Sequence, residues 1–316
     1  MSRVLITGGV GFQGGHLARH WAQAGHEVTV LNTPSPRARQ RYQTEMQYWN
    51  WPVRAVWGSV TDPEVVGKAV EDQDVVVHLA AVANPDQTIA APVQCVSVNV
   101  RGTGMVLEAV RRTGCRLIYG SSCEVYGSLR PGQSEQTEDS PFFPSTPYAA
   151  SKAAADRLCW AWGQTFGLRV TIVRPCNVFG PWQAVGPHGG VIPNFVRAML
   201  RQEPLRIRGT GDQWREYLAI DDLVQGYDLA LHEARIGVLN LGSGQLIPIR
   251  EIAEWLQRRY GARIEHTAAR AGDVTGFRLG WALAKEYGFL PQVDFWKGLE
   301  EYVDWARTAG RHTWEG

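Results

Sequence analysis

Apolar runs and helix-like segments alternate along the first half of the chain. Apolar runs suited to buried strands occur at residues 4–6, 27–31, 53–57, 74–79, 116–119 and 169–173. Segments with apolar residues at helical spacing occur at residues 17–24, 63–70, 92–112 and 148–166. Strands that alternate with helices are typical of a parallel sheet with helices on both faces. The pattern therefore predicts an α/β fold with a doubly wound, parallel, six-stranded sheet.

The alternation loosens after Pro175. Residues 181–190 contain two prolines and three glycines, and a helix at 192–201 and a short strand at 205–207 follow. A chain of 316 residues is long enough for two domains of the usual size, ~100–200 residues each. We therefore predict a first domain over residues 1–175 and a smaller, loop-rich domain over residues 176–316, with some segments of the latter returning to the first.

A glycine-rich turn joins the first strand to the first helix. Residues 7–15 read Thr-Gly-Gly-Val-Gly-Phe-Gln-Gly-Gly, which places Gly8, Gly11 and Gly14 three residues apart. In such a turn the first glycine bends the chain, the second lets backbone approach a pyrophosphate, and the third lets the helix pack closely on the strand. The start of the helix then offers free N–H groups to an anion. This turn predicts a dinucleotide site in a Rossmann-type fold.

The residue after the second strand bears on the choice of cofactor. An acid there accepts hydrogen bonds from the adenosine ribose and disfavours a 2′-phosphate, but this chain has Asn32, which carries no charge. Arg37 and Arg39 are close enough in sequence to meet a phosphate, or they belong to a solvated loop. NAD is the predicted cofactor and NADP stays open. Asp62 is either a neighbour of the adenine or the N-cap of a helix beginning at Pro63.

Charge and composition exclude several other classes of function. The formal net charge of +1 gives no strong attraction to nucleic acid or to an anionic membrane. No apolar run reaches the ~18 residues that span a bilayer, and the chain begins directly with a strand rather than a signal peptide. The five cysteines lack Cys-x-x-Cys spacing and are odd in number, which favours reduced thiols. We therefore expect a cytoplasmic protein with no metal site, no nucleic-acid partner and no membrane partner.

Candidate catalytic residues lie between positions 121 and 152. Tyr148 and Lys152 have the Tyr-x-x-x-Lys spacing, which puts both side chains on one helix face, one turn apart. A nearby cation lowers the pKa of a tyrosine, so Tyr148 can take a proton from a sugar hydroxyl while hydride leaves the same carbon. Ser122 follows the fifth predicted strand and supplies a hydroxyl that completes the set. Without Ser122, the Tyr-Lys pair is equally compatible with an ordinary helix surface.

These residues, together with seven further segments, resemble the extended short-chain dehydrogenase/reductase family, and within it the NAD-dependent nucleotide-sugar epimerases and dehydratases. The segments lie at residues 78–81, 99–103, 174–181, 190–193, 215–222, 240–244 and 270–273. The resemblance covers nearly the whole chain. It implies an enzyme with a Rossmann-type first domain, a bound NAD and a nucleotide-diphosphate sugar as substrate.

The resemblance also implies contacts for individual residues. It assigns the cofactor to Gly8, Gly11, Phe12, Gln13, Gly14, Asn32, Arg37, Ser59, Val60, Leu79, Ala80, Ala81, Asn99, Tyr148, Lys152 and Pro175. It assigns the substrate to Asn177, Val191, Arg215, Arg270 and Asp273. Amide and guanidinium groups such as those of Asn177, Arg215 and Arg270 suit the oxygens of a diphosphate. Two departures bear on the identity of the cofactor, since Asn32 and Ser59 stand where many family members have acids.

The pair Cys123-Glu124 bears on which reaction follows. Oxidation at C4 of the sugar acidifies the C5 proton, and a carboxylate such as Glu124 can remove it. In the family, 4,6-dehydratases have Asp-Glu at these positions, UDP-glucuronate decarboxylases have Ser-Glu, and 4-epimerases have small or hydroxylated residues in place of the glutamate. The Cys-Glu pair is similar to that of 5,6-dehydratases of nucleoside-antibiotic pathways. Cys123 would then protonate the departing hydroxyl, or it is a buried filler and Glu124 forms a salt bridge.

These observations favour a dehydratase, with three alternatives left open: a UDP-sugar 4-epimerase, a nucleotide-sugar decarboxylase and a non-catalytic nucleotide-binding protein. The last is disfavoured because such a protein is free to lose Tyr148 or Lys152. The resemblance further implies a homodimer paired through two helices. Both helices carry apolar residues beyond one inward stripe, namely Val96, Val98, Val106, Val110, Leu158, Trp160, Trp162 and Phe166.

Overall fold

The computed structural model describes residues 1–47, 52–83, 85–186, 189–269 and 276–308. The chain divides into two compact units, each built from three separate segments. The first unit comprises Met1–Ser122, Pro147–Arg174 and Val224–Leu239. The second comprises Cys123–Thr146, Pro175–Leu223 and Asn240–Gly316.

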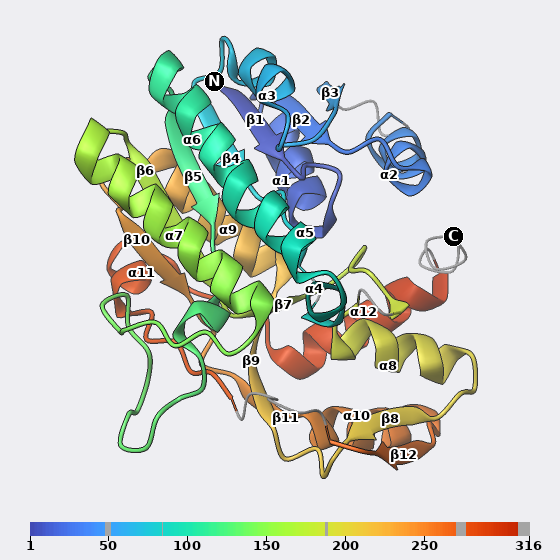
Figure 1. Ribbon diagram of the computed structural model, residues 1–316. Coiled ribbons are helices and arrows are strands. Elements are labelled where there is room, and N and C mark those ends of the chain that lie inside the picture. The colour runs from blue at the N-terminus through green and yellow to red at the C-terminus, as the bar shows by residue number, and fades with distance from the viewer. Residues whose placement is uncertain (48–51, 84, 187–188, 270–275, 309–316) are drawn as a thin grey trace. The chain divides into compact units, whose positions relative to one another are not determined.

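A seven-stranded sheet forms the centre of the first unit, in the order β10-β6-β5-β4-β1-β2-β3 (Figure 1). Its strands are β1 (Arg3–Thr7), β2 (Glu27–Asn32), β3 (Val53–Trp57), β4 (Val75–His78), β5 (Arg116–Gly120), β6 (Val170–Pro175) and β10 (Val238–Leu241). The neighbours from β3 to β6 all pair in parallel. The α/β fold class is confirmed. Because the strand order reverses between β1 and β4, a ligand is expected at their carboxyl ends.

The predicted number of strands was one too few. All six predicted strands are present, and β10 adds a seventh at the edge next to β6. Its four residues, Val-Leu-Asn-Leu, are too few for a strand to be distinguished by sequence period alone. Hydrogen bonds from the neighbouring strand β6 position β10. Thr171 donates its hydroxyl to the carbonyl of Ile236, and Ile172 donates its N–H to the carbonyl of Gly237, just before β10 begins.

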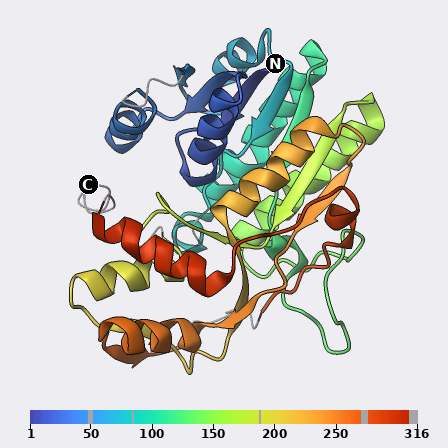
Figure 2. The ribbon, with the colours of Figure 1, turned by 180° about the vertical axis from the view of Figure 1, so that it is seen from behind.

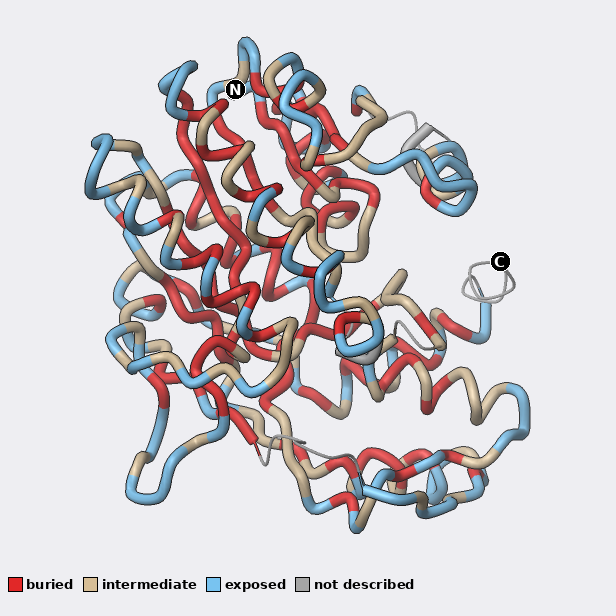
Figure 3. Tube along the Cα trace, viewed as in Figure 1, coloured by how far each residue is buried: buried red, intermediate tan, exposed pale blue. Residues whose placement is uncertain are grey.

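Helices cover both faces of this sheet. The helices in this part of the chain are α1 (Phe12–Gln23), α2 (Pro36–Arg41), the π-helical η1 (Tyr42–Gln47), α3 (Pro63–Val70), α4 (Pro85–Ala90), α5 (Pro92–Val96), the π-helical η2 (Ser97–Arg101), α6 (Gly102–Thr113), α7 (Pro147–Phe166) and α9 (Ile220–His232), and five of them cover the sheet. Helices α3, α6 and α7 lie on one face (Figure 1), and α1 and α9 lie on the other (Figure 2). The strands of the sheet are almost wholly buried except for the edge strand β3, whose residues after Val53 are partly or fully exposed (Figure 3).

The helix predicted over residues 92–112 consists of three consecutive segments. A π-helical turn, η2, separates α5 from α6 and widens the helix by one residue at Asn99. Such turns are frequent at functional sites because they redirect one side chain without ending the helix. Periodicity did not reveal it, since the apolar spacing on either side of the turn remains helical.

The second unit contains two small sheets with helices packed against them. One sheet has the order β11-β9-β7 and the other pairs β12 with β8. The elements are the 3₁₀ turn η3 (Cys123–Tyr126), β7 (Asn177–Phe179), α8 (Val191–Leu200), β8 (Leu205–Arg208), β9 (Trp214–Ala219), β11 (Leu246–Pro248), α10 (Ile249–Tyr260), β12 (Ile264–Thr267), α11 (Ala282–Glu286) and α12 (Phe295–Thr308). Aromatic rings form its core, with the Phe295 ring 5.3 Å from that of Phe179 and 5.0 Å from that of Tyr217.

Two further features of the chain bear on its environment. All five cysteines are buried free thiols. Within the described part of the chain, no helix combines the length and the apolar character needed to cross a bilayer.

Candidate active site

The glycine turn after β1 is too tight for side chains. Gly8 has φ of +69°, and a Cβ there would lie 2.9 Å from the backbone nitrogen of Ala80. A Cβ at Gly14 would lie 2.4 Å from the carbonyl oxygen of Gly8, and one at Gly11 would lie 2.9 Å from the same oxygen. Both distances are shorter than any real contact of this kind, so the turn requires glycine at all three positions.

The start of α1 is suited to an anion. Gly11 is the N-cap residue and has no side chain with which to satisfy the first N–H groups of the helix. The first turn, which includes Phe12 and Gln13, carries no acidic residue. The first N–H groups of the helix, which no capping side chain occupies, and the helix dipole therefore favour a pyrophosphate at this position. The residues present fit a dinucleotide cofactor.

Asn32, at the end of β2, points toward the glycine turn. Its Oδ1 accepts a hydrogen bond from the backbone nitrogen of Val10 at 3.4 Å. Ser59 and Val60 follow β3, the strand next to β2, and Ser59 pairs its hydroxyl with that of Thr61 at 2.8 Å, whereas Val60 is buried. The structure therefore brings Asn32 to the turn and directs the Ser59 hydroxyl into a local bond.

The arginines after β2 belong to a helix rather than to a loop. Ser35 caps α2, and both Arg37 and Arg39 are exposed on it. The guanidinium of Arg39 lies over the ring of Trp57 at 4.8 Å. Asp62 accepts hydrogen bonds from the first N–H groups of α3, so the N-cap interpretation of this residue is confirmed.

The segment after β4 is tied to the glycine turn through Thr7. The Thr7 hydroxyl accepts hydrogen bonds at 3.2 Å from the backbone nitrogens of both Leu79 and Ala80. It also pairs with Nδ1 of His78 at 2.6 Å. Burial, with a smaller effect from Lys152, lowers the pKa of His78 to about 3, so this ring is neutral and structural. Ala81, which follows, is partly buried.

Asn99, in the π-helical turn, holds the next part of the same segment. Its side chain accepts from the backbone nitrogen of Val82 at 2.7 Å and donates to the Val82 carbonyl at 3.0 Å. It also donates to the hydroxyl of Ser151 on α7 at 2.8 Å. Asn99 thus links the segment after β4 to the helix that carries Tyr148 and Lys152.

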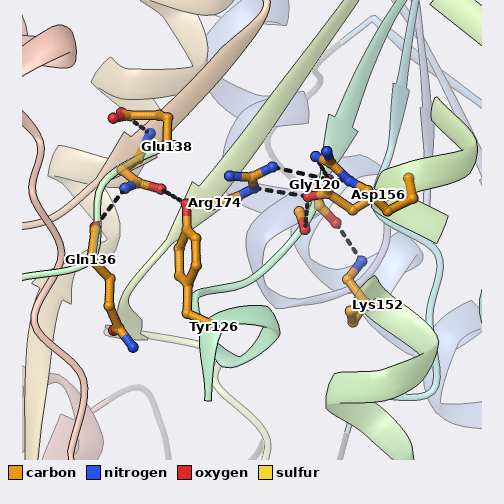
Figure 4. Close-up of polar contacts among 10 residues, drawn as sticks. Gly120, Tyr126, Gln136, Glu138, Lys152, Asp156 and Arg174 are labelled. Atoms are coloured by element: carbon orange, nitrogen blue, oxygen red, sulfur yellow. Dashed lines mark hydrogen bonds and ion pairs between the residues drawn. The ribbon is translucent and has the colours of Figure 1, made fainter. Parts of the chain in front are cut away.

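Tyr148 and Lys152 occupy the first turns of α7. Tyr148 is partly exposed, whereas the Lys152 side chain is buried and donates its ammonium to the carbonyl oxygen of Gly120 at the end of β5 (Figure 4). The ammonium also lies 4.4 Å from the centre of the Tyr119 ring. Burial lowers the pKa of Lys152 to about 8, so the charged ammonium is still the main form at pH 7. The helix thus presents a phenol with a fixed cation one turn away.

A buried ion pair one turn further along α7 was missed by the sequence analysis. Asp156 is fully buried and accepts two hydrogen bonds from Arg174, with Nε at 2.9 Å and Nη2 at 3.0 Å (Figure 4). The hydroxyl of Ser121 donates to the same carboxylate at 2.7 Å. The sequence carried a signal for it, because Tyr148, Lys152 and Asp156 form a continuous series of residues four apart on one helix face.

Ser122, Cys123 and Glu124 follow β5 after one intervening residue, Ser121. Ser122 and Glu124 are partly exposed, whereas Cys123 is 2% exposed. Cys123 begins the turn η3, and Glu124 is its second residue. Tyr126, which ends the turn, donates its hydroxyl to Asn240 at 2.7 Å (Figure 4). The turn is therefore anchored inside the second unit.

The residues assigned to the substrate lie in the second unit. Asn177, two residues after Pro175 at the end of β6, donates its amide to the carbonyl of Glu216 at 3.2 Å. The Arg215 guanidinium donates to the carbonyl of Trp214 at 2.9 Å. Val191 is the first residue of α8, whose N-cap Gly190 has no capping side chain. Arg270 and Asp273 lie outside the described residues.

Glu216, between Arg215 and Tyr217, is a second buried carboxylate that the sequence analysis did not single out. It accepts hydrogen bonds from the backbone nitrogens of Ser243, Gly244 and Leu279 at 2.7–2.8 Å. Burial raises its pKa despite these three donors. Glu216 thus fixes the strand β9 that carries Arg215.

A model of the NAD dependent epimerase/dehydratase family matches residues 4–242. The chain belongs to this family. The resemblance drawn from the sequence motifs is confirmed, and the glycine turn, Tyr148 and Lys152 all lie within the matched residues.

Members of the epimerase/dehydratase family with different reactions resemble the chain almost end to end. The dTDP-glucose 4,6-dehydratase DesIV of Streptomyces venezuelae, solved with NAD bound, is 33% identical with a TM-score of 0.91, over 99% of both chains. The UDP-glucose 4-epimerase of Thermus thermophilus, in complex with NAD, is 31% identical with a TM-score of 0.88, over 97% of this chain and 99% of that one. The UDP-N-acetyl-alpha-D-glucosaminuronate decarboxylase of Bacillus cytotoxicus is 32% identical over 96% and 98% of the two chains. Overall similarity therefore identifies the family but not the reaction.

The glycine turn yields a test of cofactor binding. In Gly14→Ala, the new Cβ would meet backbone atoms at 2.4 and 2.7 Å, so the turn must shift. We expect the dissociation constant for NAD, measured by calorimetry, to rise by roughly tenfold or more, since tenfold corresponds to only ~1.4 kcal/mol. Gly67→Ala is the matched control, because its Cβ would meet no atom within 4 Å in helix α3. An unchanged NAD affinity in Gly14→Ala would contradict the assignment of this turn.

Proposed function

We propose that this protein is an NAD-dependent nucleotide-sugar dehydratase that works through a 4-keto intermediate. The observation that carries the proposal is the combination of two features around β5 and α7. Tyr148 stands one turn from the buried ammonium of Lys152, and the partly exposed carboxylate Glu124 lies two residues after Ser122. The first feature suits oxidation of a sugar hydroxyl, and the second suits removal of a proton from the neighbouring carbon.

The glycine turn and its surroundings would hold NAD. Gly8, Gly11 and Gly14 would give the close backbone approach that the pyrophosphate needs, and Asn32, which bonds the glycine turn at Val10, would bond the adenosine ribose. When bound, the nicotinamide would accept a hydride from C4 of the sugar and later return it. Asn32 has no charge to repel a 2′-phosphate, so NADP is the second choice of cofactor.

Tyr148 would act as the base for the C4 hydroxyl. The ammonium of Lys152 favours the phenolate, because an opposite charge nearby stabilises the charged form of tyrosine. Ser122 would donate or accept a hydrogen bond at the same hydroxyl and so orient it. Asn99, which bonds both Val82 and Ser151, would hold α7 at the segment proposed to contact the cofactor.

Glu124 would remove the C5 proton once C4 is a ketone, because the ketone acidifies that proton. Loss of the hydroxyl from the adjacent carbon, with a proton supplied by the protein, then completes the loss of water. Cys123 is one source of that proton, since a thiol still protonates a leaving hydroxyl. Its 2% exposure equally suits a residue that only fills the core. Both roles are distinguished by the Cys123→Ser variant, which would lose most activity only in the first case.

The second unit would bind the nucleotide diphosphate of the substrate. Asn177 and Arg215 provide an amide and a guanidinium on adjacent strands β7 and β9, which pair in parallel. Val191 opens α8, where the N-cap lacks a side chain that would compete with a phosphate. Arg270 and Asp273 complete the proposed set. The first unit would accordingly be the dinucleotide-binding domain and the second the substrate domain.

The direct test is to incubate the purified protein with a panel of UDP-, dTDP-, GDP- and CDP-sugars. Mass spectrometry of the products separates the candidate reactions. Loss of one water supports the dehydratase, loss of carbon dioxide supports a decarboxylase, and an unchanged mass with an inverted C4 centre supports an epimerase. No conversion of any sugar would favour the non-catalytic alternative.

Tyr148→Phe tests the oxidation step. The variant lacks the group that takes the C4 proton, so turnover should fall by roughly a hundredfold or more, the scale of one acid–base contribution. Binding of the nucleotide sugar, measured by calorimetry, should change little. Near-normal turnover on the substrate found in the panel would show that Tyr148 is not the base.

Glu124→Gln tests the step that distinguishes a dehydratase. The variant should stop the loss of water yet still oxidise C4, which is visible as reduced cofactor absorbing at ~340 nm, because the Tyr148 chemistry comes first. With the unmodified protein in heavy water, deuterium should enter at C5 through reprotonation of the enolate. Absence of deuterium from C5 of both product and recovered substrate argues against a base at this carbon.

A UDP-sugar 4-epimerase is the second candidate. It is favoured by the similarity to the Thermus thermophilus enzyme over nearly the whole of both chains. An epimerase needs only the Tyr148 and Lys152 chemistry and leaves C5 untouched. Under this alternative, Glu124→Gln would retain most activity.

We further propose that the protein is a homodimer, paired through α5 and α7. The exposed apolar residues on these helices are Val93, Val96, Trp160 and Phe166, of which Val93 is 82% exposed. Val106 and Val110, which the sequence analysis counted toward this surface, instead pack in the core beneath α6. The free thiols of all five cysteines suit a reducing compartment, so we propose the cytoplasm as the location.

Val93→Asp tests the proposed dimer. A charge on this apolar surface should shift the protein toward the monomer at micromolar concentration, as measured by light scattering. Leu290→Asp is the control, because this exposed residue of the second unit lies outside both helices. A monomer mass for the unmodified protein would remove the proposal.

A further inference from the structure

We propose that Asp156 is a positioning residue of the active site, with two roles: it keeps the buried ammonium of Lys152 charged, and it fixes Ser121 beside Ser122. The consequence for catalysis rests on the proposed function, in which Lys152 assists Tyr148. The two structural roles rest only on contacts within the first unit.

The carboxylate of Asp156 is saturated with donors. One oxygen accepts from Ser121 at 2.7 Å and from Nε of Arg174 at 2.9 Å, and the other accepts from Nη2 of Arg174 at 3.0 Å and from Arg157 at 2.5 Å. The Asp156 side chain is fully buried and that of Arg174 is 1% exposed. These donors lower the pKa of Asp156 against the opposing effect of burial, so the carboxylate stays ionised.

Asp156 lies one helical turn after Lys152 on α7, and among the described residues it is the carboxylate whose charge acts on this ammonium. The other titratable groups around this ammonium are Tyr148 and Cys159 on α7, Cys95 on α5, His78 on β4 and Tyr119 on β5. Burial raises the pKa of Tyr119 and Cys159 well above their usual values and lowers that of His78, so these three are neutral. Without Asp156, the two buried cations Lys152 and Arg174 would both lose the carboxylate whose charge acts on them.

The second role concerns the chain at the end of β5. Ser121 donates its backbone N–H to Val173 at 2.7 Å and its hydroxyl to Asp156. Gly120, the residue before it, accepts the Lys152 ammonium. Lys152 and Asp156 on α7 thus bond Gly120 and Ser121, the two residues that precede Ser122 (Figure 4). The position of the proposed catalytic hydroxyl of Ser122 therefore depends on these two bonds.

The composition of the chain makes the first role measurable. The protein has only four lysines: Lys68, Lys152, Lys285 and Lys297. Lys152 is buried and the other three are exposed. With ¹³C at the ε-carbon of lysine, NMR of the full-length protein should show four signals, of which the Lys152 signal should titrate at a pKa of about 8. Lys152→Met, which removes one signal, identifies the buried lysine.

In Asp156→Asn, the midpoint of the Lys152 signal should fall by roughly one unit or more, because a neighbouring anion has been removed from a buried cation. Arg157→Gln is the matched control: Arg157 contacts the same carboxylate from the half-exposed surface, and its loss should leave the midpoint unchanged. Asp156→Glu keeps a carboxylate at this position, so its Lys152 midpoint should lie close to that of the unmodified protein. A midpoint in folded Asp156→Asn equal to that of the unmodified protein would overturn the first role.

Asp156→Asn removes the charge that the buried Arg174 guanidinium pairs with in the native protein and so risks unfolding. The double variant Asp156→Asn, Arg174→Met removes both charges of the buried ion pair, so no unpaired charge is left to unfold the protein. Circular dichroism checks the fold before the Lys152 midpoint is measured. Its Lys152 midpoint should still lie below that of the unmodified protein. An equal midpoint in this folded double variant would likewise contradict the first role.

Ser121→Ala separates the second role from the first, since it removes the hydroxyl bond but keeps the ion pair. It should leave the Lys152 midpoint unchanged and lower turnover roughly tenfold on the substrate found in the sugar panel, with KM little altered. Unchanged turnover would overturn the second role. The two claims about Lys152 can also fail separately. If the titration midpoint of Lys152 falls in Asp156→Asn but the pH profile of turnover is unchanged, the first role of Asp156 is supported and the proposed catalytic use of Lys152 is wrong.

Discussion

The closeness of backbone to backbone at the end of β1 is the constraint on which the first unit depends. Gly8 and Ala80 come so near that neither a side chain nor a different φ at Gly8 is compatible with the turn. The Thr7 hydroxyl stabilises the same close approach, because it accepts hydrogen bonds from two backbone N–H groups of the segment after β4. Two segments separated by about seventy residues in sequence are thereby joined at the point where the strand order reverses, which is where a doubly wound sheet offers a crevice to a ligand.

Most of the first unit could be predicted because its signals are local. Strand and helix periods are set by neighbouring residues, and the turn chemistry of Gly8, Gly11 and Gly14 is written in one short stretch. The helix α3 was predicted with its observed bounds, since Asp62 and Pro63 mark its start. The family followed from motifs of the same kind.

The features that escaped prediction depend on distant partners. The spacing of Asp156, four residues after Lys152, hints at a role, but its burial depends on Arg174 and Ser121, which are 18 and 35 residues away in sequence. Glu216 is similar, because its three donors come from segments that follow it by 27 to 63 residues. The strand β10 is too short to be recognised without its neighbour β6. The arginine-rich segment after β2 has no apolar period, so its helix depends on the cap at Ser35.

The π-helical turn at Ser97–Arg101 has a consequence for how the length of this chain can vary. Each residue of a helix rotates the next by about 100°, so deleting one residue from this turn would restore a regular helix and swing everything on one side of it relative to the other. Asn99 would lose either Val82 or Ser151, and the apolar side chains of α6 would leave the sheet. Deletions or insertions here should be tolerated far less well than substitutions, because the number of residues between α5 and α6 sets the rotation of one helix relative to the other.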